Sequence, residues 1–228
     1  MKIYLDTANW IEWKLPSGCP PIQGVTTNPT LVKQAGLPVI LNAYLDLISR
    51  AADLELTELM MQLPSSELSD VRQWLDELLT AAKRANVVLT IKLPCHPSWS
   101  AVIAEVRERG QPFLLTGVSN PVQLLWAKSQ GAHFVAPYLG RLQEAGRDID
   151  AFVGACVAAQ IAGPKLLAAS IRNTDVFSRL VASGAYAATV RPAFLKGLIT
   201  DPLTDSAIKD FEADIAASQD YASPSSER

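Results

Sequence analysis

Short apolar stretches rich in β-branched residues alternate with longer, more polar stretches along this chain. The pattern predicts eight strands separated by helices. Parallel strands need such crossover segments, so we predict a single parallel (β/α)8 TIM barrel. An open doubly wound sheet is the alternative, but the chain has no glycine-rich turn typical of nucleotide binding on such a sheet. The predicted strands are residues 2–6, 24–28, 58–63, 87–93, 112–118, 133–138, 165–171 and 188–192.

The segments between the strands carry helix start and stop signals. Residues 66–85 begin at a serine, with acidic residues early and basic residues late, which suits the helix dipole. A helix over residues 98–110 is predicted to end at a glycine. Two more helices, over 120–131 and 173–184, are each predicted to begin at an asparagine and end at a glycine.

An amphipathic segment, 204–219, follows the last strand and predicts an extra C-terminal helix. That helix would pack on its own barrel or on a neighbouring copy. We therefore expect one barrel domain with its C-terminal helix over residues 1–219 and a flexible tail over 220–228.

Composition narrows the class of protein. Apolar residues make up 49% of the chain and charged residues 19%, which supports a large buried core. A net charge of −3 gives no basic surface for nucleic acid or an anionic membrane. No apolar run is long enough for a membrane span, and the N-terminus lacks the apolar core of a signal peptide. Three scattered cysteines have no metal or redox spacing, so we expect reduced thiols and a cytoplasmic location.

Lys92 is the most unusual residue in the pattern, because it lies inside the apolar strand 87–93. Desolvating an ammonium group is costly unless it is paired or loses its proton. A lysine with a depressed pKa is a nucleophilic amine that can form a Schiff base with a ketone. The resulting iminium accepts electrons during carbon–carbon cleavage. The alternative is a structural lysine that extends to the barrel rim and pairs with Asp6.

Polar residues also lie at the ends of nearly all the predicted strands, where catalytic groups gather in this fold. Asp6 and Asn28 are suited to hold the lysine and the substrate hydroxyls. A proton would move through Tyr138 or through a water molecule between Gln62 and Thr116. Arginines near the later strands suit a phosphate. The strand-end set is Asp6, Thr26, Asn28, Gln62, Lys92, Thr116, Tyr138, Arg141, Ser170 and Arg172.

Several motifs together resemble the transaldolase family, including its short fructose-6-phosphate aldolase branch. They are YLDTANW, GVTTNPTLV, IKLP, VAPYLGRL and AASIRN, in order from residue 3 to about residue 219. The resemblance implies a barrel that uses a Schiff-base lysine without metal or cofactor. It implies that Lys92 is that lysine and that Asp6 handles protons and positions it. It also implies that Asn28 binds the dihydroxyacetone unit and that Thr116 helps to hold the catalytic water.

By the same resemblance, Arg141, Ser170 and Arg172 would bind the phosphate. Gln62 and Tyr138 resemble the aldolase branch, since transaldolases proper carry glutamate and phenylalanine there. Ala136 is small and would leave room beside Tyr138. The loop after Lys92 lacks the usual threonine and glycine, and Gln143 replaces an acidic residue, with Glu144 beside it. The short branch forms pentamers and decamers, so the resemblance implies a homo-oligomer held by the C-terminal helix.

Three functions follow from these observations. The first is an aldolase that makes or cleaves fructose 6-phosphate, or a similar sugar phosphate, through dihydroxyacetone and glyceraldehyde 3-phosphate. The second is a transaldolase that passes the dihydroxyacetone unit to an acceptor without releasing it. The third is a barrel that binds sugar phosphates without catalysis.

His96 and Cys95 lie close to Lys92 in the sequence and would allow a metal or redox site. A loop histidine and a free thiol explain these two residues better.

Overall fold

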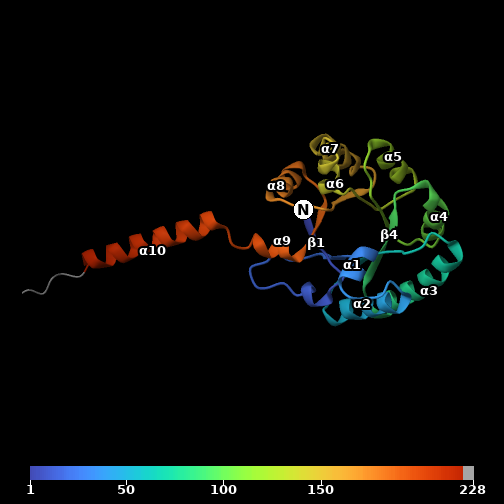
Figure 1. The fold of residues 1–228 in the computed structure, drawn as a ribbon, viewed down its shortest axis with the longest axis horizontal. Coiled ribbons are helices and arrows are strands. Elements are labelled where there is room, and N and C mark those ends of the chain that lie inside the picture. Colours follow the sequence, from blue (N-terminus) through green and yellow to red (C-terminus); the bar gives the residue numbers. More distant parts are fainter. Residues whose placement is uncertain (223–228) are drawn as a thin grey trace, which may run out of the picture.

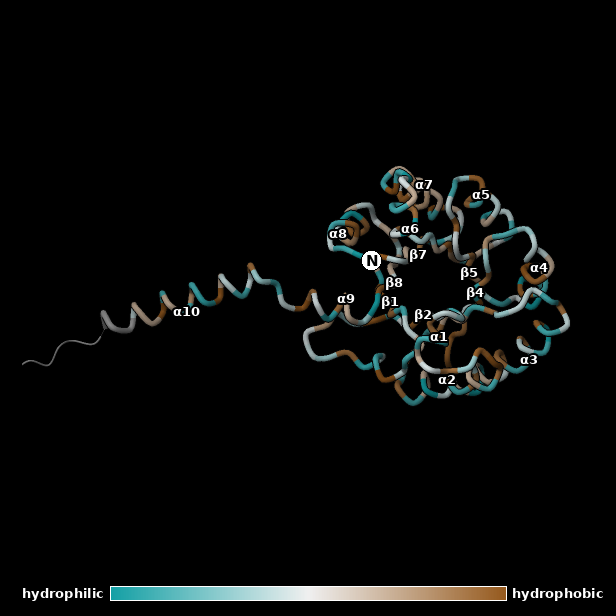
Figure 2. The backbone as a smooth tube through the Cα atoms, in the orientation of Figure 1, coloured by the Kyte–Doolittle hydropathy of each residue, from teal (hydrophilic) through white to brown (hydrophobic). Residues whose placement is uncertain are grey.

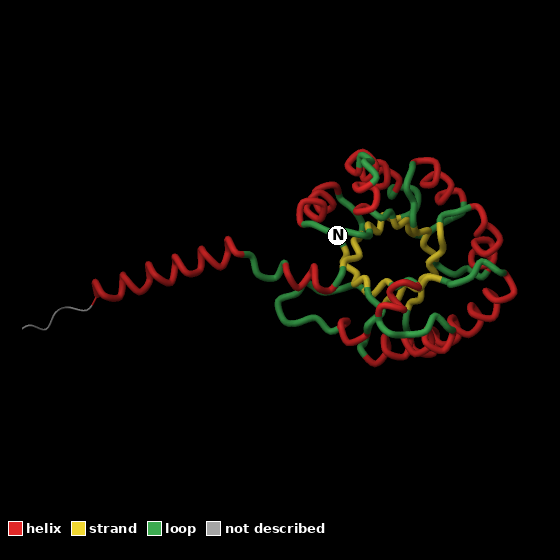
Figure 3. The backbone as a smooth tube through the Cα atoms, viewed as in Figure 1, coloured by secondary structure: helices red, strands yellow, loops and turns green. Residues whose placement is uncertain are grey.

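A computed structural model describes residues 1–222 of the chain; residues 223–228 lie outside the described part. Eight parallel strands pair in sequence order and close into a barrel, with β8 beside β1. Figure 3 shows the strands as a ring inside a layer of helices. The (β/α)8 prediction is confirmed. The strands are β1 (Lys2–Asp6), β2 (Gly24–Thr26), β3 (Glu58–Gln62), β4 (Val88–Pro94), β5 (Phe113–Thr116), β6 (Phe134–Ala136), β7 (Lys165–Ala168) and β8 (Ala187–Val190).

Helices follow the strands and cover the outside of the ring (Figure 1). The predicted segments 66–85, 98–110, 120–131 and 173–184 correspond to α3, α4, α5 and α8. Helices α1 and α2 connect β2 to β3, α6 and α7 connect β6 to β7, the 3₁₀ turn η1 lies between β1 and β2, and α9 follows β8. The helices are α1 (Pro29–Gln34), α2 (Leu41–Asp53), α3 (Leu68–Ala85), α4 (Ser100–Glu108), α5 (Pro121–Ser129), α6 (Leu139–Glu144), α7 (Ile149–Ala159), α8 (Thr174–Ser183), α9 (Pro192–Gly197) and α10 (Pro202–Ala222), with 3₁₀ turns η1 (Trp10–Trp13) and η2 (Pro97–Trp99).

Capping residues mostly lie where the sequence places them. Asn120 and Asn173 accept hydrogen bonds at the start of α5 and α8, and Gly184 ends α8 in the left-handed conformation. The start of α3 differs from the prediction: its N-cap is Glu67, which makes no side-chain cap bond. The hydroxyl of Ser65 accepts from the Glu67 amide instead, so the serines form the preceding turn.

Strand periodicity divides the core into two parts. Side chains on the outer face of the ring pack against the helices in one large cluster. In Figure 2 hydrophobic positions, coloured brown, recur along both the strands and the surrounding helices. A smaller cluster fills the barrel interior, as expected for a packed barrel rather than a pore. Its buried members are Tyr4, Met60, Leu114, Ala136, Leu167 and Ala187.

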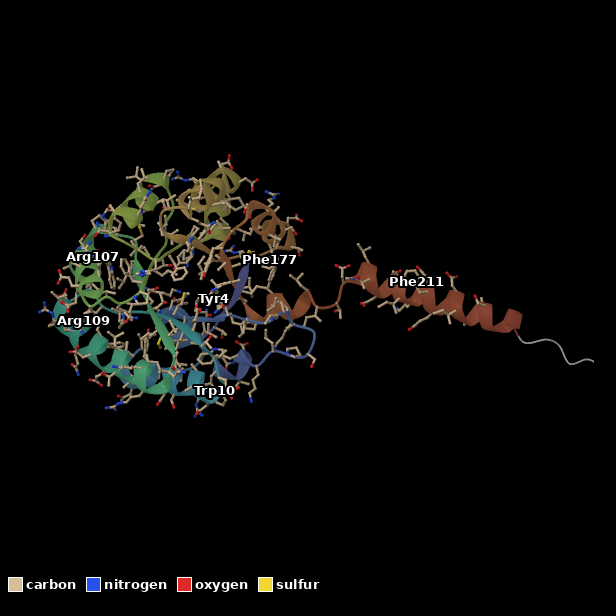
Figure 4. The ribbon with its side chains drawn as sticks, turned by 180° about the vertical axis from the view of Figure 1, so that it is seen from behind. Tyr4, Trp10, Arg107, Arg109, Phe177 and Phe211 are labelled. Atoms are coloured by element: carbon tan, nitrogen blue, oxygen red, sulfur yellow. The ribbon has the colours of Figure 1, made fainter. Side chains whose placement is uncertain are left out.

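A polar network lies near the N-terminal end of the barrel. The Tyr4 hydroxyl donates to Glu58 at 2.5 Å, and the Gln23 amide donates to the other carboxylate oxygen at 2.6 Å. Tyr4 itself is fully buried and lies well inside the ring in Figure 4. Burial and the contact with Glu58 raise the pKa of the Tyr4 phenol. These contacts satisfy the polar groups at the end of the barrel opposite Lys92, where such residues support stability.

Six predicted strands are too long at their C-terminal ends: by one residue at β3, by two at β2, β5, β6 and β8, and by three at β7. In four of them a helix start or a left-handed residue ends the strand. β2 ends at Thr26 because Asn28 caps α1, and β6 ends at Ala136 because Tyr138 begins α6. β5 ends at Thr116, before the left-handed Gly117. β7 ends at Ala168, since Ser170 has a φ of +59° that no strand residue adopts. Asn28, Tyr138 and Ser170 therefore stand just beyond the strands to which the sequence analysis assigned them.

The C-terminal helix exists but does not pack on its own barrel. α10 extends away from the ring (Figure 1), and Phe211 lies far from the barrel in Figure 4. Helix α10 continues to Ala222, past the predicted boundary at 219. The rest of the predicted tail lies outside the described residues. Over residues 1–222, no helix is both long and apolar enough to cross a membrane.

Candidate active site

A cavity of about 490 Å³ opens at the C-terminal end of the barrel. Ten of the eleven residues predicted for the site line it, and Thr26 lies behind Asp6. The barrel brings them together because all parallel strands end on the same side. The predicted residues that line the cavity are Asp6, Asn28, Gln62, Lys92, Thr116, Ala136, Tyr138, Arg141, Ser170 and Arg172.

Lys92 lies in this cavity and is almost completely buried, with 3% of its surface exposed. Its β4 position pairs with Gln62 on β3 and Leu114 on β5. Burial lowers the pKa of Lys92, and the negative charge of Asp6 partly opposes that shift. Among the described residues no carboxylate lies within 4.0 Å of its ammonium. This geometry differs from a lysine that extends to the rim to form an ion pair, and it favours a neutral amine.

A chain of hydroxyls holds Asp6. Thr26 donates to the Asp6 carboxylate at 2.8 Å, and the hydroxyls of Thr26 and Thr189 lie 2.7 Å apart. Because the Thr26 proton points to Asp6, Thr189 is the donor to Thr26. Both threonines are buried, so this chain fixes the carboxylate at the cavity wall. Thr26 therefore acts on Asp6 rather than on a ligand, and Thr189 on β8 is a supporting residue that the sequence analysis missed.

Tyr138 lies across the cavity at the start of α6. The Thr116 hydroxyl donates to the Tyr138 oxygen at 2.7 Å, and the Arg141 guanidinium lies 4.9 Å from the centre of the tyrosine ring. Burial raises the pKa of the Tyr138 phenol and Asp6 adds to the effect, while Thr116 and Arg141 act in the opposite direction. Tyr138 is thus a protonated phenol whose hydrogen is free to point into the cavity.

Asn28 has two tasks at once. Its side-chain oxygen accepts from the Leu31 amide at 3.0 Å and caps α1. Its amide NH₂ is then the group left to donate to a ligand in the cavity. Gln62 ends β3 beside Lys92, and Ala136 contributes one small buried side chain to the cavity wall. These three residues present amide groups and one methyl group to the cavity, and none of them is charged.

The arginine side of the cavity depends on a close approach at Gly140. Its amide donates to the Ser170 carbonyl at 2.9 Å. A β-carbon at position 140 would lie 2.6 Å from that carbonyl oxygen and 2.7 Å from Arg172 Nε. Only glycine lets α6 approach the β7 loop this closely. Ser170 holds a left-handed φ of +59°, a strained conformation that is frequent at functional sites.

Arg172 is already engaged by a carboxylate. Both of its terminal nitrogens contact the carboxylate of Glu144, at the end of α6. Arg141 and Arg191, which also line the cavity, have no carboxylate partner within 4.0 Å in the described part of the chain. Sequence reasoning missed Arg191, and it treated Glu144 only as a neighbour of an altered position. Arg191 lies near the end of the predicted strand 188–192, and that position was the signal that could have identified it.

Comparisons with known proteins agree on one family. The family described as transaldolase/fructose-6-phosphate aldolase matches residues 3–224. The chain is 29% identical to a "probable transaldolase" of Rhodospirillum centenum, over 94% of this chain and 90% of that protein. It is 32% identical to a "probable transaldolase" of Dehalococcoides mccartyi, over 94% and 97%. It is 28% identical to a "probable fructose-6-phosphate aldolase" of Streptococcus pneumoniae, over 94% and 96%.

A solved structure described as a lactate oxidase of Pediococcus acidilactici is similar in fold alone. Its TM-score is 0.56 at 14% identity, and the match covers 86% of this chain and 64% of that chain. A barrel hosts many unrelated reactions, so this likeness supports the architecture and not the chemistry.

Gly140→Ala should damage the arginine side of the cavity. The added methyl must displace the Ser170 backbone or Arg172, which we expect to lower the free energy of unfolding by about 1–3 kcal/mol. Chemical denaturation measures the loss. Gly154→Ala in α7 is the matched control: its β-carbon meets nothing within 4 Å, so it should gain up to about 1 kcal/mol. Equal stability of the two variants would contradict the close approach.

Lys92→Met should stabilise the fold at neutral pH by about 1–3 kcal/mol, because it replaces a buried amine with an apolar chain. The folded protein holds the Lys92 proton less tightly than the unfolded chain does. Wild-type stability therefore rises with pH between the lowered pKa of Lys92 and the ordinary lysine value of about 10.4. The advantage of the variant should shrink over that window. Denaturation curves from neutral to alkaline pH measure it, and a constant difference would contradict a buried, deprotonating lysine.

Proposed function

Because the chain belongs to the transaldolase/fructose-6-phosphate aldolase family, we propose that it is a class I aldolase acting through a Schiff base on Lys92. Its substrate is fructose 6-phosphate or a similar sugar phosphate. The observation that carries this proposal is the buried Lys92 amine, whose pKa is lowered and which opens into a cavity large enough for a sugar. A neutral amine attacks a ketone, whereas an ammonium does not.

In the cleavage direction, the Lys92 nitrogen attacks C2 of the ketose, and loss of water gives an iminium. A base removes the proton of the C4 hydroxyl, and the C3–C4 bond breaks. Its electron pair moves to the iminium, so glyceraldehyde 3-phosphate leaves and an enamine remains. Protonation of the enamine at C3 and addition of water to C2 then release dihydroxyacetone and restore the amine. The reaction needs no oxidant and no cofactor, since every electron pair stays within the substrate and Lys92.

The cavity residues divide this work. Asp6, held by Thr26, stands near Lys92 to take and return protons. The Tyr138 phenol, with its hydrogen free, is suited to protonate the enamine at C3, while the Asp6 carboxylate is the group that can accept the C4 hydroxyl proton. The Asn28 amide can bind a hydroxyl of the dihydroxyacetone unit. Arg141, Ser170 and Arg172 lie on one side of the cavity, where they would bind the phosphate.

A transaldolase is the second candidate, and the names of several relatives favour it. It would transfer the dihydroxyacetone unit to an acceptor aldehyde rather than release it. Gln62 and Tyr138 favour the aldolase, because a phenol beside the enamine allows protonation and release without an acceptor. The two reactions differ in a simple assay: the aldolase forms glyceraldehyde 3-phosphate from fructose 6-phosphate alone, and the transaldolase needs erythrose 4-phosphate.

Tyr138→Phe should separate the two reactions. We expect cleavage of fructose 6-phosphate without an acceptor to fall by roughly 10²–10⁴-fold, and transfer to erythrose 4-phosphate to fall much less. Coupled assays of glyceraldehyde 3-phosphate with and without acceptor measure both. Tyr186→Phe, just before β8 at the opposite end of the barrel, controls for loss of a hydroxyl. If both reactions fall equally, the phenol is not what permits release.

The proposal includes a cytoplasmic homo-oligomer. Its support is α10, which extends from the barrel and exposes Leu203, Ile208, Phe211 and Ile215. A helix in a protein gains most of its stability from packing of its apolar face. Each further copy of the chain carries the same apolar face on α10, so the α10 helices of two copies can pack against each other. The three cysteines are free thiols, which is consistent with a reducing compartment.

Phe211→Asp should dissociate the assembly. Phe211 lies with Ile208 and Ile215 on one face of α10 by helical spacing, and a charge there would be buried in any interface. We expect light scattering after gel filtration to give the monomer mass for this variant. Ala217→Asp is the control, since it adds the same charge on the opposite face. A wild type that is itself monomeric, or a variant that keeps the wild-type mass, would contradict assembly through this face.

A further inference from the structure

Arg191 is an unfavourable residue for its position in the fold. It follows β8 directly and stands as the N-cap of α9, but it makes no side-chain cap bond. Arginine is a poor N-cap, and a positive charge at a helix N-terminus is unfavourable. A residue that breaks a local rule without a gain for the fold points to a functional role.

The side chain of Arg191 is directed toward the cavity. Its backbone continues the extended conformation of β8, so it shares the inward face of Thr189, two residues earlier. Both residues line the cavity. One guanidinium nitrogen donates to the side-chain oxygen of Gln34, at the end of α1, at 3.1 Å. Arg191 therefore spans from the β8 end to the helix that follows Asn28.

This contact orients the guanidinium without neutralising it. An amide oxygen is uncharged, and within residues 1–222 no carboxylate lies within 4.0 Å of Arg191. Arg172 differs, because Glu144 engages both of its terminal nitrogens. An anionic ligand at Arg172 must compete with that carboxylate. At Arg191 the same ligand meets an oriented guanidinium whose positive charge has no carboxylate partner among the described residues. The planar set of N–H donors on a guanidinium matches the oxygens of a phosphate.

We propose that Arg191 is a specificity-determining residue that binds an anionic phosphate group of the substrate on the β8, β1 and α1 side of the cavity. Loops after the seventh and eighth strands often hold phosphate in this fold. The phosphate belongs either to the aldehyde half of the sugar or to its dihydroxyacetone half. The inference rests on the proposed function for the substrate class, a sugar phosphate, but not on the Lys92 chemistry.

Equilibrium binding of unreactive sugar alcohols tests the proposal without catalysis. Glucitol 6-phosphate and glucitol 1-phosphate carry the phosphate on either half and have no carbonyl for Lys92 to attack. Isothermal titration would compare wild type with Arg191→Gln, which keeps most of the length and loses the charge. We expect the variant to bind at least one of the two phosphates about tenfold or more weakly. The ligand affected identifies which half carries the phosphate that Arg191 binds.

Two further variants make the test specific. Arg84→Gln removes an exposed arginine in the last turn of α3, outside the cavity, and should bind both ligands like wild type. Arg191→Lys keeps the charge but not the planar fork, so it should recover only part of the affinity. Thermal melting of Arg191→Gln should stay close to that of wild type, since the residue is exposed.

The outcomes are distinct. Wild-type affinity of Arg191→Gln for both phosphates overturns this assignment and leaves the proposed function standing. If the wild type binds neither phosphate, the sugar-phosphate substrate class fails and this assignment fails with it. A loss for Arg191→Gln that Arg84→Gln reproduces would show only a long-range charge effect and would also overturn the assignment.

Discussion

A lysine amine held inside a β-barrel is the constraint on which the rest of this structure depends. Lys92 is 3% exposed and has no carboxylate within 4.0 Å among the described residues. Its position on β4, between Gln62 and Leu114 on the neighbouring strands, keeps the amine from reaching bulk water. The cost of burying it falls on its charged form, so the barrel itself lowers the pKa of Lys92. The packed barrel interior, which includes Tyr4, therefore contributes to the reaction by keeping Lys92 buried.

The cavity around that amine has two sides with different physical character. On one side, hydroxyl, amide and carboxylate groups form short hydrogen-bond chains, as in Thr189 to Thr26 to Asp6. These groups can move protons but hold no fixed positive charge. On the other side, Arg141 and Arg172 follow β6 and β7, and Glu144 neutralises Arg172. Arg191 follows β8, which pairs with both β7 and β1, so it lies where the two sides meet. A sugar phosphate has the same division, with hydroxyls at one end and an anion at the other.

The sequence predicts the barrel well because its strands are β-branched apolar runs, and because Asn120, Asn173 and Gly184 mark helix ends by local chemistry alone. Lys92 is recognisable from the same pattern, since a charge in an apolar run is costly to bury. The strand ends were overestimated, because a polar residue such as Tyr138 fits a strand end and a helix start equally well. Thr189 and the Arg172–Glu144 contact depend on which strands and helices become neighbours, and no local pattern encodes that. The exposure of α10 is likewise invisible to periodicity, because an apolar face does not specify what covers it.

The most direct test of the account is intact mass after borohydride reduction in the presence of fructose 6-phosphate, on wild type and Lys92→Met side by side. Borohydride converts an iminium into a stable secondary amine and leaves a non-covalent complex unchanged. The account predicts a dihydroxyacetone-sized adduct on wild type and none on the variant. Absence of an adduct on the wild type, or an equal adduct on both proteins, would contradict a Schiff base on Lys92.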